Sequence, residues 1–290
     1  MIVVAGGSGV LGQQVVATLL SRQEKIRVVV RDAVRARHLL GPDVEVVAAD
    51  VRHLHALRGA VAGASVVICA VHGFLGGRGA GPAEVDGLGN AHLTEVAQAT
   101  GADVVLLSVV GAAPDSPVEL FRAKFFAEQR LRESGARWTV VRASAFFETW
   151  LGILTKTAGT SGRPMVFGQG NQPISFVSAG DVATVVGDAA TDPCTRGQVV
   201  EVTGPVLTMN QLAGALQDAH GWQGSIRHLP RPALRAISVL ARPVSPSFAR
   251  QNHTALVMDT TPLASHAEGG NPVRIRVATM PDILTTGSPG

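Results

Sequence analysis

The sequence contains no tyrosine, and this absence excludes a phenol as the acid or base of any reaction that the chain performs. It has only two cysteines, Cys69 and Cys194, and their separation matches no metal-binding or redox motif. We therefore predict no metal site and a reducing compartment. Cys69 lies within the apolar run 64–71, which favours a position in the core.

Long runs of basic residues and long runs of apolar residues are also missing. The chain carries 25 basic and 22 acidic residues, and no basic run of the kind that follows a nucleic-acid backbone, so no nucleic-acid partner is expected. No uninterrupted apolar stretch approaches the ~20 residues that span a bilayer. No secretory or transit segment is visible near Met1. These features predict a cytoplasmic protein without a membrane partner.

What the sequence does contain is an alternation of short apolar runs and helical patterns, with 46% hydrophobic residues over 290 positions. Runs that are apolar on both faces and are joined by helices are typical of parallel strands covered on each side. We predict an α/β fold, a doubly wound parallel-sheet Rossmann fold with a smaller C-terminal α+β substrate-binding region. The Rossmann core spans 1–154 with 174–204 returning to it, and the C-terminal region spans 155–290. The predicted strands of the core are Ile2–Ala5, Arg27–Val30, Val44–Ala48, Ser65–Ala70, Val104–Leu107 and Trp138–Val141.

A glycine-rich turn joins the first predicted strand to the first predicted helix. Gly6 permits a tight turn, Gly9 allows the backbone to approach a diphosphate, and Gly12 lets the helix pack close to the strand. The helix N-terminus offers free N–H groups and partial positive charge to the phosphates. The alternative is a purely structural glycine turn. The context predicts a dinucleotide site whose further contacts are Ser8, Val10 and Leu11.

The residues after the second strand bear on the choice of cofactor. Arg31 stands where an acidic residue would accept from the ribose hydroxyls of NAD, and its guanidinium suits the 2′-phosphate of NADP. Arg35 is four residues further on and can turn the same way. The alternative is that Arg31 is a surface residue and Asp32 takes the ribose. We predict NADP(H).

Two further strand ends complete the predicted cofactor site. Asp50 and Val51 close the third strand, where this architecture places the adenine ring; Asp50 alternatively caps the helix that begins near His53. The backbone of Ala70, Val71 and His72 ends the fourth strand beside the ribose and diphosphate.

With these motifs in order, the sequence resembles the atypical short-chain dehydrogenases, in the NmrA-like group of NAD(P)-binding proteins. The resemblance covers about residues 1–215. It implies an NADP-preferring Rossmann core, with a smaller C-terminal region over the nicotinamide and the substrate in the cleft between them. The matching segments are Gly6–Gly12, Val30–Asp32, Ala49–Val51, Val85–Gly87, Leu107–Ser108, Lys124 with Glu128 and Leu131, Val141–Ala143 and Phe176–Ala183.

Ordinary members of that superfamily use a tyrosine and a lysine four residues apart on one helix. Here Leu120 occupies the tyrosine position, while Lys124 remains, one of three lysines beside 22 arginines. The resemblance makes Lys124 a ribose ligand and a candidate proton donor. The alternative is a solvated Lys124–Glu128 helix pair.

The other candidate donors are Ser108, which alternatively bonds the backbone at its strand end, and His72, which alternatively is incidental. Resemblance further places Ala143, Ser144 and Phe146 beside the nicotinamide. Phe147 and Trp150 either line a substrate pocket or pack in the core.

The sequence favours an NADPH-dependent reductase of a small, largely apolar carbonyl, quinone or enone. Two alternatives remain: an NADP(H)-binding redox sensor without turnover, which the missing tyrosine favours, and an NADP-bound isomerase, cyclase or dehydratase. The expected partner is a small-molecule substrate, and self-association stays open.

Overall fold

A computed structural model describes residues 1–42 and 44–263, which form two compact units. The first contains Met1–Ala143 and Ala179–Val202, and the second contains Ser144–Ser178 and the described residues from Thr203 onwards. The sequence analysis placed the first boundary at 154. The first unit ends earlier, at Ala143, because the residues that follow form a strand and a helix of the second unit. The predicted C-terminal region beyond 263 lies outside the described residues.

The first unit is built on a seven-stranded sheet in which all neighbouring strands are parallel, in the order β10-β6-β5-β4-β1-β2-β3. The predicted doubly wound Rossmann fold is thereby confirmed. The chain order reverses beside β1, and sheets of this kind bind ligands outside the carboxyl ends of their strands at that point. The strands are β1 Ile2–Ala5, β2 Ile26–Val30, β3 Glu45–Ala48, β4 Val66–Cys69, β5 Asp103–Val109, β6 Trp138–Ala143 and β10 Gln198–Val202.

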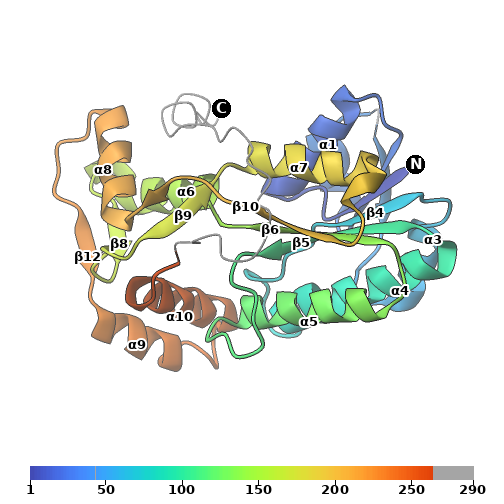
Figure 1. Ribbon diagram of the computed structural model, residues 1–290. Coiled ribbons are helices and arrows are strands. Elements are labelled where there is room, and N and C mark those ends of the chain that lie inside the picture. Colours follow the sequence, from blue (N-terminus) through green and yellow to red (C-terminus); the bar gives the residue numbers. More distant parts are fainter. Residues whose placement is uncertain (43, 264–290) are drawn as a thin grey trace. The chain divides into compact units, whose positions relative to one another are not determined.

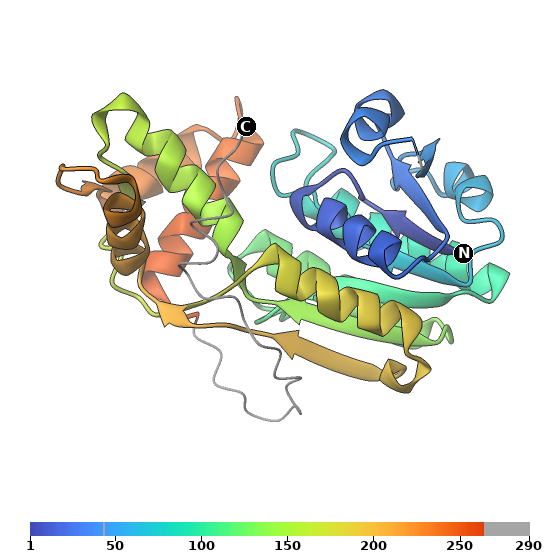
Figure 2. The same ribbon diagram turned by 90° about the horizontal axis from the view of Figure 1, so that it is seen from above.

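Helices cover both faces of this sheet (Figure 1). On one face α1 (Val10–Ser21) lies beside α7 (Ala179–Thr191), as Figure 2 shows, with α2 (Ala33–Leu40) next to α1. The opposite face carries α3 (Leu54–Ala60), α4 (Asn90–Thr100) and α5 (Glu119–Glu133). A π-helix, η1 (Ala83–Gly89), leads directly into α4 and packs against α5. The sequence analysis did not predict η1.

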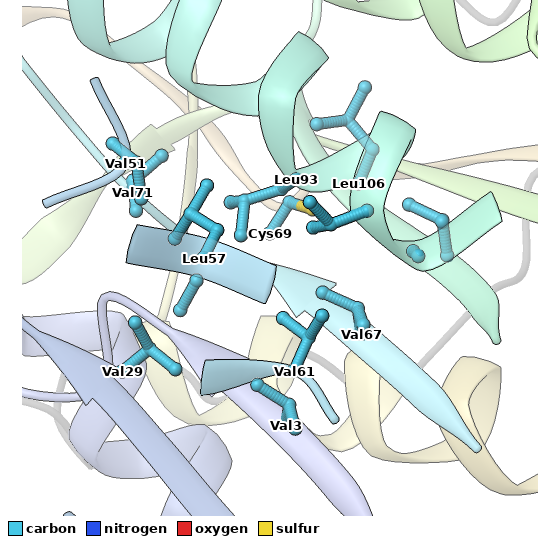
Figure 3. Close-up of a cluster of buried hydrophobic side chains, with 14 of the residues drawn as sticks. Val3, Val29, Val51, Leu57, Val61, Val67, Cys69, Val71, Leu93 and Leu106 are labelled. Carbon is cyan, nitrogen blue, oxygen red and sulfur yellow. The ribbon is translucent and has the colours of Figure 1, made fainter. Parts of the chain in front are cut away.

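One hydrophobic cluster of the first unit's core lies between the sheet and the α3–α4 layer (Figure 3). Val3, Val67 and Leu106 from the strands meet Leu57 and Leu93 from the helices, and all are buried. The predicted core position of Cys69 is confirmed, since its side chain has no exposed area. Burial raises the pKa of the Cys69 thiol to about 12, so this thiol stays protonated at neutral pH.

The second unit combines short strands with helices. Strands β7 (Ala145–Phe146), β9 (Ile174–Val177) and β11 (Val206–Leu207) form one small sheet, and β8 (Met165–Phe167) pairs with β12 (Arg227–Leu229) in another. Phe147 and Phe176 stack in its core with ring centroids 5.3 Å apart. Its helices are α6 (Phe147–Ala158), α8 (Met209–His220), α9 (Arg231–Leu240) and α10 (Pro246–Thr260). A short 3₁₀ turn follows α6 at Gly159–Ser161, and another lies in the first unit at Pro193–Thr195.

Across the described residues, no helix combines the length and the apolar character that crossing a membrane requires.

Candidate functional site

The glycine turn between β1 and α1 takes the shape that its sequence predicts. Gly6 has a φ of +89°, which side chains rarely adopt, and a Cβ there would lie 2.6 Å from the carbonyl oxygen of Ala70. A Cβ on Gly12 would collide with the carbonyl oxygen of Gly6 and would lie 2.7 Å from Cα of Gly7. The protein itself therefore requires glycine at positions 6 and 12.

Gly9 differs from these two glycines. Its backbone is ordinary extended chain, with φ −77° and ψ 169°, and a Cβ there would meet only the Gly6 carbonyl oxygen, at 3.5 Å. Nothing within the described chain requires a glycine at this position. Gly9 is the N-cap of α1, no side chain caps the helix, and its first turn holds no acidic residue. The N–H groups at the start of α1 are thus left to an external acceptor, which a diphosphate fits.

The residues after β2 divide into a capping residue and two exposed arginines. Asp32 is the N-cap of α2, and its carboxylate accepts from the backbone N–H of Arg35 at 2.9 Å. The side chains of Arg31 and Arg35 are exposed and have no hydrogen bond or ion pair within residues 1–42 and 44–263. Asp32 is therefore committed to the helix, while both guanidinium groups are available.

The Asp50 carboxylate, just after β3, accepts hydrogen bonds from Arg52 and does not cap a helix. Arg52 donates from Nε and Nη2 to the Asp50 carboxylate, with its Nε 3.0 Å from Oδ1. The hydrogen bond from Arg52 lowers the pKa of Asp50 to about 2. The predicted capping alternative is wrong, because α3 begins after His53 and no side chain caps it. Val51, next in the chain, is buried.

A buried ion pair lies at the end of β4. Lys124 of α5 and Asp86 of η1 are 4% and 0% exposed, and Lys124 Nζ lies 3.0 Å from Asp86 Oδ1. Lys124 also donates to the carbonyl oxygen of Val71 at 3.3 Å. The alternative of a solvated Lys124–Glu128 pair is therefore wrong, since Lys124 is buried and its partner lies on another helix.

His72 joins this pair from the side of the solvent. Its side chain is 52% exposed, and its Nδ1 lies 3.7 Å from Asp86 Oδ1. The backbone N–H of Gly73 donates to the other carboxylate oxygen at 2.7 Å. Burial by itself raises the pKa of Asp86, but the Lys124 ammonium, His72 and the Gly73 N–H outweigh it, so the pKa lies below its usual range. Asp86 is thus a carboxylate that faces two nitrogen bases.

Ser108 of β5 has a partner that neither interpretation of the sequence foresaw. Its hydroxyl donates to Oε1 of Glu128 at 2.5 Å, and both side chains are buried. Arg142 of β6 binds both oxygens of Glu128, at 2.9 and 2.8 Å, and Arg132 adds a further contact at 2.9 Å. Because its single proton is committed to Glu128, Ser108 as it stands has no proton to donate to a substrate.

The remaining predicted residues lie at or beyond the end of β6. Ala143 ends the strand and is buried, while Ser144 and Phe146 begin the second unit. Their predicted role beside a nicotinamide stays a prediction. Phe147 belongs to the core. Trp150 lines a small, mostly apolar pocket within the second unit, together with Phe167, Gln172, Ile174, Met209 and Met258.

Sequence reasoning missed the roles of Asp86 and Glu128, although both lie in segments that carried the family resemblance. Each is a fully buried carboxylate that holds a basic side chain. Acidic residues are almost never fully buried unless they are paired, so an acid inside an otherwise apolar helical face is the signal that could have found them.

A model of the NmrA-like family matches residues 1–259. The chain belongs to the NmrA-like family. It is 32% identical over 224 residues to an NAD(P)H azoreductase of Xenophilus azovorans, covering 76% of this chain and 74% of that protein.

Solved structures agree in fold with this NmrA-like chain. The Citrobacter sp. triphenylmethane reductase complexed with NADP(H) has a TM-score of 0.78 at 18% identity, covering 98% of this chain and 99% of the other. The NADPH-dependent quinone oxidoreductase of Escherichia coli, complexed with NADPH, has a TM-score of 0.75 at 20% identity and covers 99% of both chains. At these identities the likeness establishes the fold that the NmrA-like chain shares with them.

Proposed function

We propose that the chain is an NADPH-dependent oxidoreductase that reduces small, largely apolar acceptors such as quinones, azo compounds and enones. Its membership of the NmrA-like family and its 32% identity to an NAD(P)H azoreductase support an NAD(P)-dependent reductase in general. The observation that carries the proposal is the turn at Gly6–Gly12. Position 9 of this turn is a glycine, although no contact within the described chain excludes a side chain there.

The cofactor's diphosphate is assigned to the start of α1. There the backbone N–H groups of Val10, Leu11 and Gly12 open an uncapped helix, and an anion gains both their hydrogen bonds and the favourable end of the helix dipole. Ser8 and Gly9 border the same corner. When bound, the dihydronicotinamide supplies the hydride for the reduction.

The preference for NADPH rests on Arg31 and Arg35. Two exposed guanidinium groups that make no hydrogen bond or ion pair with residues 1–42 and 44–263 suit a 2′-phosphate, which accepts charge-assisted hydrogen bonds from both. Asp32 is the residue that would favour NADH by accepting from the ribose hydroxyls, but its carboxylate caps α2. Val51 and the carboxylate of Asp50 are assigned to the adenine side of the site.

The end of β4 provides the polar groups for the reaction. The backbone of Ala70 and Val71 runs past Gly6. One of the three N–H donors of Lys124 has an acceptor in the Val71 carbonyl oxygen, and its ammonium is ion-paired with Asp86, so a donor remains for a ribose hydroxyl. His72 and Lys124 are the candidate acids in a chain that has no tyrosine. Ser108 is assigned a positioning role, because its proton is held by Glu128.

The test is acceptor-dependent oxidation of NADPH by the purified chain. A panel of quinones, azo dyes, enones and aldehydes is mixed with NADPH, and loss of the reduced-nicotinamide absorbance is followed. The proposal predicts substrate-dependent loss with at least one acceptor class and faster turnover with NADPH than with NADH. Tight NADPH binding with no turnover on the whole panel would favour a redox sensor instead.

A further inference from the structure

Asp86 has a geometry that cofactor binding alone does not explain. It is fully buried, yet its carboxylate faces His72, a side chain that is half exposed. Oδ2 accepts from the Gly73 N–H, while Oδ1 is shared between Lys124 Nζ at 3.0 Å and His72 Nδ1 at 3.7 Å. Oδ1 makes no hydrogen bond of good geometry within the described residues, so one acceptor position is open towards the imidazole.

The fold around Asp86 is specialised. The residue lies in η1, a π-helix, and such turns occur often at functional sites. Close packing fixes this segment. A Cβ on Gly89 would lie 2.6 Å from the side chain of Val51, and a Cβ on Gly73 would lie 2.5 Å from the carbonyl oxygen of Gly81. The carboxylate is thus held by rigid backbone on both sides.

The imidazole of His72 is oriented by two contacts. Its ring stacks on Phe74, with centroids 5.9 Å apart and planes 25° apart, and its Nδ1 faces Asp86. Nε2 has no partner in the part of the chain that the structure describes. At 3.7 Å the two atoms are within ion-pair range, and a hydrogen bond between them requires the ring to move closer to Asp86. In catalytic triads a carboxylate accepts from one imidazole N–H and so leaves the other ring nitrogen to exchange protons, and Asp86 and His72 are arranged in the same way.

We propose that Asp86 is a positioning residue that fixes the Nδ1–H of His72 and thereby makes His72 Nε2 the proton donor to the reduced substrate. This inference rests on the proposed function. Reduction adds a hydride from NADPH to the acceptor, which leaves NADP⁺ and an electron pair on an acceptor oxygen or nitrogen. That atom takes the Nε2 proton of the His72 imidazolium. The neutral ring keeps its Nδ1–H on Asp86, and solvent returns the Nε2 proton.

Lys124 is less suited to this step. Its ammonium is 4% exposed, and losing its proton would leave the Asp86 carboxylate buried without its closest counter-charge. Lys124 instead keeps Asp86 ionised. Cys69, near the same ammonium, keeps its proton and stays neutral. Asp86 thus faces His72 directly, and Lys124 pairs with the same carboxylate oxygen.

The first test needs no turnover and no substitution of Asp86. Nitrogen NMR of histidine in the nucleotide-free protein reports which ring nitrogen carries the proton in the neutral form, and a His72→Gln variant assigns the signal among the nine histidines. The inference predicts the Nδ1–H tautomer for His72. The Nε2–H tautomer, which free imidazole side chains prefer, would overturn it.

The second test compares two kinds of acceptor. Quinones and azo dyes need a proton as well as a hydride, whereas a cationic triarylmethane dye accepts a hydride at its central carbon and needs no proton. His72→Gln should lower kcat roughly 100-fold more with the first kind than with the dye, as general acid catalysis typically contributes. Equal effects on both kinds, or no effect on either, would overturn the inference. His55→Gln, an exposed histidine on α3, is the matched control.

The role of Asp86 is tested in a double variant, because replacing Asp86 alone would leave the Lys124 ammonium buried without its counter-charge. Asp86→Leu together with Lys124→Met removes the ion pair and the carboxylate acceptor as a unit, and circular dichroism checks that the variant folds. In this variant His72 should revert to the Nε2–H tautomer; retention of Nδ1–H would overturn the role of Asp86. If the wild-type chain reduces no acceptor, the proposed function fails, while the tautomer still reports whether Asp86 positions His72.

Discussion

Replacing Gly9 with alanine should separate nucleotide binding from folding. The backbone at Gly9 already has a conformation that alanine adopts, and the new Cβ would meet only the Gly6 carbonyl oxygen, at an ordinary 3.5 Å. The remaining cost is a poorer N-cap, about 1 kcal/mol or less. For a chain of this size, that shifts the Tm by about 2–4 °C.

The same methyl group occupies the corner assigned to the diphosphate. Displacing the diphosphate weakens one or two charge-assisted hydrogen bonds, each worth about 1.5–3 kcal/mol. Since each 1.4 kcal/mol is a factor of ten, the Kd for NADPH should rise at least about tenfold. Isothermal titration calorimetry measures the Kd, and thermal unfolding without nucleotide measures the stability.

Two further glycines serve as controls. Gly12→Ala places a Cβ against the backbone of Gly6 and Gly7, so it should destabilise the free protein, by about 1–3 kcal/mol. Gly59→Ala in α3 meets no atom within 4 Å, so it should leave the Kd unchanged and raise stability by up to about 1 kcal/mol, because alanine favours a helix more than glycine does. The reasoning is refuted if Gly9→Ala folds normally and binds NADPH as tightly as the wild type.

Three other changes test separate parts of the account. Arg31→Asp should weaken NADPH binding at least about tenfold more than NADH binding, through loss of charge-assisted hydrogen bonds to the 2′-phosphate; an equal loss in calorimetry contradicts the assignment. Lys124→Met should cost about 3–5 kcal/mol in denaturant unfolding, because the Asp86 carboxylate stays buried without its ammonium partner, and Asp86→Asn in the same chain should recover much of it. Full stability of the single variant would argue against the buried pair. Acid unfolding tests Asp50, whose folded pKa of about 2 lies below the ordinary 3.8. Its contribution is complete above pH 3.8 and is lost as the pH falls towards 2, so Arg52→Ala should lower stability at neutral pH more than at pH 2.

The Rossmann core could be predicted from sequence because its signals are local. Each parallel strand is a short apolar run, and the Gly6–Gly12 turn encodes both a backbone conformation and a close approach of backbone to backbone. The π-helix η1 escaped prediction because Gly87 and Gly89 favour a loop. Only the packing of Gly89 against Val51, a distant residue, explains why a glycine is needed there.

Two helices at the end of the second unit could not be predicted from local sequence signals. Helices α9 and α10 form in a proline- and arginine-rich stretch for which no elements were predicted. Helix α9 is amphipathic, but only Leu234 and Ser238 are buried and Val239 and Leu240 are exposed, so its apolar residues do not mark its buried face. These helices owe their existence to packing against each other, which propensity does not encode.

The sequence predicted which residues belong to the candidate site, but not which side chains pair with one another. Lys124 and His72 were singled out by their chemistry, and the structure brings both to one carboxylate, Asp86. Ser108 was singled out as well, but Glu128 takes its proton. Such pairings join different helices and strands, so they depend on how η1 and β5 pack against α5, which no spacing in the sequence specifies.

A crystal structure of the chain with saturating NADPH tests the central claim most directly. The account predicts the diphosphate oxygens on the backbone N–H groups of Val10, Leu11 and Gly12, with Gly9 in contact and the 2′-phosphate beside Arg31. A nucleotide bound elsewhere, or an empty α1 N-terminus at saturating NADPH, would contradict it.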